Sequence, residues 1–141
     1  MEFREIIKTN ESKQNFLKGM IQFAKIDGVV TEEEVAYFMS AADSLGLNHN
    51  IVIEYIESND SNISFETDLE KLLFMREAIQ ICYVDNRYDV KEKELVEKFS
   101  KDFEFSKEIV KTIENWVEDG MAWKKRGDDM LFSLSIDRKD G

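Results

Sequence analysis

The sequence of 141 residues contains no proline, a single cysteine and a single histidine. It also lacks a histidine cluster, a glycine-rich phosphate loop, a Cys-x-x-Cys pair and a candidate Ser-His-Asp set. These absences leave an enzyme with the least support among the function classes, and we expect no catalytic residues. Because Cys82 has no second cysteine with which to form an internal disulfide, the chain fits a reducing cytoplasm.

Long apolar runs and basic residues are scarce as well. No stretch approaches the roughly 18 apolar residues of a membrane-spanning helix, and residues 1–20 contain no signal-peptide core. Lys and Arg number 19 against 30 Asp and Glu, so the formal charge is −11, which disfavours nucleic acid as a partner. Residues 1–70 hold 5 basic and 14 acidic residues, whereas residues 71–141 hold 14 and 16. A cation would therefore be drawn to the first half of the chain.

What the sequence does contain is an internal repeat with an offset of 58 residues. Shifting the chain against itself by this offset aligns apolar positions with apolar positions, for example Phe16 with Phe74, Ile21 with Ile79, Ala41 with Phe99, Leu45 with Phe103 and Ile51 with Ile109. We interpret this register as a duplicated unit. Repeat one covers about residues 12–57 and repeat two about residues 69–123, with the polar residues 58–64 as a linker.

Each repeat predicts three helices. In the first repeat, apolar residues recur with helical spacing over residues 16–24, and the turn Asp27-Gly28 ends this helix. Thr31 and Glu34 have the spacing of a capping box, which opens the second helix, and Asn48 caps a short third one.

The second repeat follows the same plan, with a capping box at Thr67 and Glu70, a cap at Asp89, and a last helix from Ser106 to about Trp123. We therefore expect an all-α bundle of six to seven helices, built from two pseudo-symmetric three-helix repeats. It forms one domain over residues 1–125, followed by a tail over residues 126–141 that is open to disorder.

The most distinctive motif occurs once in each repeat, as Asp27 to Glu34 and as Asp85 to Glu92. Each copy matches the second half of an EF-hand calcium loop, in which the first residue is position five and the glutamate is position twelve. The first half of the loop lacks its carboxylates, so a complete EF-hand is excluded. Two half-sites remain, with six candidate ligands: Asp27, Thr31, Glu34, Asp85, Asp89 and Glu92.

Two interpretations of these half-sites stay open. The acidic side chains are either helix caps and turn residues, or ligands of a hard divalent cation together with backbone carbonyls. Duplication does not separate the two, because copying a turn also copies its caps. His49 is expected to lie at the surface, and Cys82 to be a small buried apolar side chain.

The paired motif resembles the tellurite-resistance TerB-like domains, and it is also similar to the N-terminal domain of a DnaJ-like membrane co-chaperone. The matching residues are Ala24-Lys25-Ile26-Asp27-Gly28 with Glu34, and Cys82-Tyr83-Val84-Asp85-Asn86 with Glu92, within roughly residues 12–124. Asn86 stands where the family pattern has glycine. The resemblance implies a bundle of about seven helices and a non-enzymatic stress-response module whose acidic turns bind a divalent cation, with calcium as the first choice and no other cofactor.

The resemblance also implies protein partners, including membrane proteins of the same gene cluster. We therefore expect a cytoplasmic protein, with the inner face of the membrane as a further location. The alternative function is a metal-free helical adaptor, in which the carboxylates only cap helices and an exposed groove binds a partner.

Overall fold

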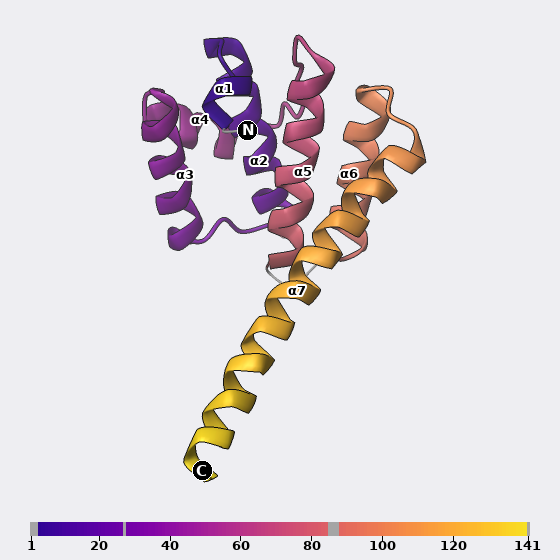
Figure 1. Cartoon of the computed structure of the whole chain (residues 1–141). Coiled ribbons are helices and arrows are strands. Elements are labelled where there is room, and N and C mark those ends of the chain that lie inside the picture. Colours follow the sequence, from indigo (N-terminus) through magenta and orange to yellow (C-terminus); the bar gives the residue numbers. More distant parts are fainter. Residues whose placement is uncertain (1–2, 27, 85–87, 141) are drawn as a thin grey trace.

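A computed structural model describes residues 3–26, 28–84 and 88–140, and within these ranges the chain forms seven helices and no strand. The helices are α1 (Phe3–Ile6), α2 (Asn10–Lys25), α3 (Glu32–Leu45), α4 (Asn50–Glu57), α5 (Asp68–Val84), α6 (Val90–Asp102) and α7 (Lys107–Asp140). The expected all-α bundle is confirmed. In Figure 1, α2 and α5 run side by side at the centre, with α3 and α4 beside α2 and with α6 and α7 beside α5.

The core lies where α2 meets α5, around the fully buried ring of Phe74. The rings of Phe16 and Phe99 approach Phe74 edge-on, with centroids 5.8 Å and 5.3 Å away. A Cβ atom at Gly19 would lie 2.5 Å from the Phe74 ring. Only a glycine at position 19 lets α2 approach Phe74 this closely, which fixes the spacing of the two central helices.

The offset of 58 residues recurs in the boundaries and caps of the helices. α2 and α5 begin at residues 10 and 68, and α3 and α6 begin at residues 32 and 90. Thr9 and Thr67 both accept a hydrogen bond from the backbone N–H three residues later, at 3.0 Å and 3.2 Å. Gly46 and Glu104, also 58 residues apart, both follow a helix with positive φ, 72° and 61°. That the two halves are copies of one unit stays a prediction from the sequence.

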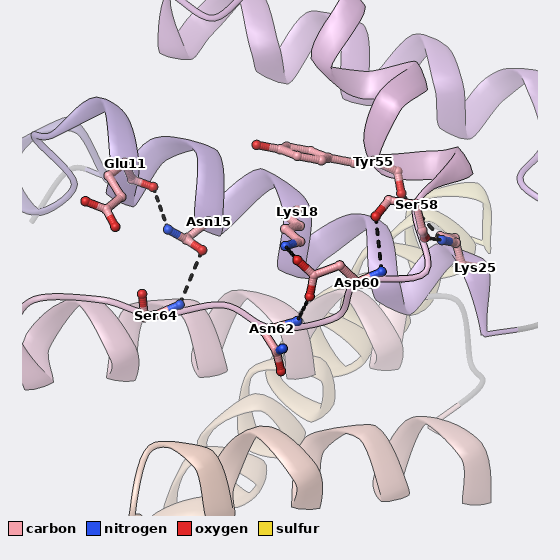
Figure 2. Close-up of polar contacts among 9 residues, drawn as sticks. All are labelled: Glu11, Asn15, Lys18, Lys25, Tyr55, Ser58, Asp60, Asn62 and Ser64. Atoms are coloured by element: carbon pink, nitrogen blue, oxygen red, sulfur yellow. Dashed lines mark hydrogen bonds and ion pairs between the residues drawn. The ribbon is translucent and has the colours of Figure 1, made fainter.

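The polar segment between α4 and α5 lies along α2 and is fixed to it (Figure 2). Lys18 pairs with Asp60 at 2.8 Å, and Oδ1 of Asn15 accepts from the backbone N–H of Ser64 at 3.3 Å. At the end of α2, the Lys25 ammonium donates to the backbone carbonyls of Tyr55, at 3.4 Å, and Ser58. The predicted linker is thus a strap that crosses α2 and ties it to the end of α4.

The end predicted for the last helix was wrong. We expected it near Trp123, whereas α7 continues to Asp140 and includes residues 126–140 of the expected tail. Neither Gly120 nor Gly127 ends the helix, and Lys125 and Asp129 form an i,i+4 ion pair at 3.9 Å across the second of them. Without proline to break the backbone pattern, the helix runs on. Figure 1 shows its distal half projecting away from the bundle.

Candidate functional site

The first acidic turn forms the predicted capping box at the start of α3. The Thr31 hydroxyl accepts from the backbone N–H of Glu34 at 3.1 Å, and Oε1 of Glu34 accepts from the backbone N–H of Thr31 at 3.1 Å. The Thr31 hydroxyl also donates to the same carboxylate oxygen at 3.0 Å. Gly28 has a φ of 89°, the left-handed conformation expected at this turn. Thr31 and Glu34 are therefore brought together, with the geometry of a helix cap.

The second acidic turn caps α6 in the same way. Oδ1 of Asp89 accepts from the backbone N–H of Glu92 at 3.0 Å, and Glu92 is only 8% exposed. Figure 1 places the starts of α3 and α6 at the same end of the bundle. Asp27 and Asp85, the leading candidate ligands, lie outside the described residues. Among the residues that the structure describes, no group of three or more acidic, histidine or cysteine side chains is arranged to hold a metal ion.

A tyrosine–glutamate cluster beside the second turn was missed by the sequence reasoning. The hydroxyl of Tyr83, at the end of α5, donates to Oε1 of Glu118 on α7 at 2.5 Å. Tyr88 hydrogen-bonds to Glu114 on the same helix, and the two tyrosine rings lie 4.8 Å apart. Burial, followed by these glutamates, raises the pKa of both phenols above the usual range.

This cluster could have been found by one signal in the sequence. Tyr83 and Tyr88 flank the turn, while Glu114 and Glu118 are four residues apart on one helical face. The cluster holds the turn against α7, and it contains no nucleophile paired with a base.

The first half of the bundle contains an apolar groove of about 290 Å³ between α2, α3 and α5. Its apolar walls include Leu17, Met20, Phe38, Ala41, Leu45 and Ile81. Ala41 and Leu45 stand 58 residues before Phe99 and Phe103, whose rings are buried in the other half of the bundle. The groove therefore opens where the second half of the chain fills the corresponding positions with two phenyl rings.

One charged pair lines this groove. Arg76 and Glu77 are joined at 3.1 Å, and the Arg76 guanidinium lies 5.7 Å from the centre of the Trp116 ring on α7. The Nε atom of Arg76 is buried without a hydrogen-bond partner. The groove thus combines an apolar floor with one polar edge that has unused hydrogen-bonding capacity.

The two remaining side chains singled out from the sequence lie where they were expected. His49 is exposed and pairs with Asp43, while Cys82 is 1% exposed on the core face of α5. Among the described residues, no helix has the length and apolar character to cross a membrane. No protein-family model, curated protein or solved structure matches the chain.

Proposed function

We propose that this protein is a non-enzymatic interaction module that binds an amphipathic helix of a protein partner in the groove between α2, α3 and α5. The observation that carries the proposal is the groove itself. In a bundle whose other half is filled by Phe99 and Phe103, the smaller Ala41 and Leu45 leave an open apolar surface with a polar edge. Such grooves receive the apolar face of a helix, with anchors at i, i+3, i+4 and i+7.

The capping geometry supports the adaptor alternative for the acidic turns. Thr31, Glu34 and Asp89 each have a partner within the cap, so their presence is explained without a ligand. The TerB-like assignment, stress response, cation binding and a location at the membrane stay predictions from the resemblance.

The groove is tested with a phage-displayed library of amphipathic helices selected on the wild-type protein. Ala41→Phe, which introduces at position 41 the side chain found 58 residues later, serves as the matched control because it fills the groove. We expect the selected helices to lose binding to Ala41→Phe and to keep it for Ala36→Phe, an exposed site on α3 outside the groove. A library that yields no helix sensitive to Ala41→Phe would contradict the proposal.

A thermal melt with EDTA, calcium or magnesium decides between caps and a cation site. A ligand at a hundred times its Kd would add about 2.7 kcal/mol of stability, and each kcal/mol raises the Tm by roughly 2–4 °C in a domain of about this size. We expect no shift in Tm for a protein whose acidic turns are caps. A calcium-specific rise that disappears in Asp27→Asn with Asp85→Asn would instead establish the predicted cation sites.

A further inference from the structure

The distal half of α7, residues 121–140, carries large apolar side chains that the bundle does not cover. Trp116, Trp123, Met130 and Leu134 are spaced by seven, seven and four residues, which places them on one face of the helix. Their exposed fractions are 55%, 72%, 54% and 53%. A continuous apolar face of this kind marks an interaction surface.

Charge separates this segment from the rest of the molecule. Residues 121–140 hold five basic and four acidic residues in a chain whose formal charge is −11. Three of the bases, Lys124, Lys125 and Arg126, directly follow Trp123. By contrast, α3, which forms one wall of the groove, carries four acidic residues and no basic one. The helix that needs an apolar partner thus has the charge that suits the groove's acidic wall.

We propose that the groove between α2, α3 and α5 receives the distal half of α7 from a second copy of this chain. This inference rests on the proposed function and names the partner of the same groove. Trp123 supplies the bulky side chain for the space beside Ala41, and the basic residues after it face α3. A chain does not fill its own groove in this way, because its α7 is one continuous helix that leads away from the bundle (Figure 1).

Reciprocity fixes the stoichiometry. Each chain carries one groove and one projecting helix, so two chains that exchange their helices satisfy both features and close with twofold symmetry. The expected assembly is therefore a dimer with two equivalent contacts.

Sedimentation velocity over a wide range of concentrations tests the inference on the full-length protein. We expect a wild-type dimer whose self-association weakens by on the order of tenfold or more in Trp123→Ser, in Ala41→Phe and in the charge reversal of Lys124, Lys125 and Arg126 to Glu. Phe132→Ser is the matched control, since Phe132 is 75% exposed on the opposite face of the same helix and its loss should leave the dimer intact. Circular dichroism checks that each variant is folded.

A mixing experiment identifies which surfaces meet. Trp123→Ser retains an intact groove and Ala41→Phe retains an intact helix, so an equimolar mixture of the two should form heterodimers although each variant alone is monomeric. A dimer that persists in Ala41→Phe would overturn the inference and indicate pairing between two α7 helices. A wild-type protein that stays monomeric at every concentration would overturn it as well. If selected library helices still bind the groove in that case, the proposed function stands and a foreign helix is the partner; if they do not, both fail.

Discussion

The hydroxyl of Tyr83 donates a 2.5 Å hydrogen bond to Glu118, and Lys25, 58 residues earlier in the chain, makes the corresponding connection in the first half. Lys25 joins the end of α2 to the end of α4, while Tyr83 joins the end of α5 to α7. One position in each half therefore ties a central helix to the helix that closes that half. The chemistry differs because Lys25 binds backbone carbonyls and Tyr83 binds a carboxylate.

Replacing both phenols of the cluster should change the alkaline stability of the protein. The pKa values of Tyr83 and Tyr88 are raised, so the folded state favours the neutral phenols. This stabilisation is complete below the unfolded-state pKa of about 10 and is lost as the pH rises from there toward the folded-state values. Tyr83→Phe with Tyr88→Phe should lower the free energy of unfolding at pH 7 and flatten its decline above pH 10.

Urea unfolding followed by circular dichroism at a series of pH values measures this difference. We expect Tyr83→Phe alone to cost about 1 kcal/mol at pH 7 through its lost hydrogen bond. Tyr37→Phe, at a tyrosine that is 58% exposed, is the control. An equally steep alkaline decline in wild type and in the double variant would refute the role of the cluster.

The two left-handed helix ends predict substitutions of opposite sign. Glu104 adopts a φ of 61°, which costs a residue with a Cβ atom on the order of 1 kcal/mol, so Glu104→Gly should stabilise the protein by up to that amount. Gly46→Ala should destabilise it by about 1 kcal/mol, because Gly46 has a φ of 72°.

Gly120→Ala separates the conformational argument from a packing one. As at Gly46, a Cβ atom at Gly120 would meet nothing within 4 Å, but Gly120 lies inside α7, and alanine should stabilise that helix by roughly 0.8–1 kcal/mol. Chemical denaturation of the three variants measures these signs. The same sign for Gly46→Ala and Gly120→Ala would contradict the explanation.

Gly19→Ala should destabilise the bundle through a steric clash. Its added methyl group would lie 2.5 Å from the Phe74 ring and 2.8 Å from Ile63, so the ring or α2 must shift. Overpacking of this kind costs about 1–3 kcal/mol. In a double-mutant cycle followed by urea unfolding, Phe74→Leu should reduce the penalty of Gly19→Ala, whereas Phe38→Leu should not. Additive effects in the Gly19–Phe74 pair would rule out the clash.

The strap between α4 and α5 predicts a depressed carboxylate pKa at Asp60. The hydrogen bond from Lys18, followed by one from the backbone N–H of Asn62, lowers the pKa of Asp60 below its usual value. Stability linked to this pair is present above the unfolded-state pKa and is lost as the pH falls through the folded-state pKa. In an NMR titration, Lys18→Met should raise the Asp60 pKa, and Lys8→Met, at an exposed lysine outside this network, should leave it unchanged. No change in Lys18→Met would show that the pair does not form in solution.

Local chemistry explains why most of the fold could be predicted from the sequence. Thr31 with Glu34 and Thr67 with Glu70 define helix starts within four residues, and both capping boxes form. Glycine at positions 28 and 46 marks left-handed turns, and both glycines have positive φ. Such signals depend on neighbours in the sequence and not on the tertiary fold.

The features that were missed depend on contacts between distant residues. Pairing of Tyr83 with Glu118 joins residues 35 positions apart, and the position of the groove follows from the smaller side chains of Ala41 and Leu45 in a packed interior. The sequence displayed the Ala41/Phe99 alignment, but only the assembled bundle converts that difference in volume into an open surface. The continuation of α7 was missed because glycine at 120 and 127 was given the meaning of a terminus, although no capping residue accompanies either.

The long last helix joins two regimes of local stability within one element. Its first half is held by α5 and by Tyr83, whereas the amides beyond the bundle depend only on helical hydrogen bonds that water can reach. Amide hydrogen exchange should therefore slow progressively from the free end of α7 toward the bundle, and the outer turns should open without global unfolding. A segment with this gradient contributes little to the cooperativity of folding, and its order can be set by whatever binds it.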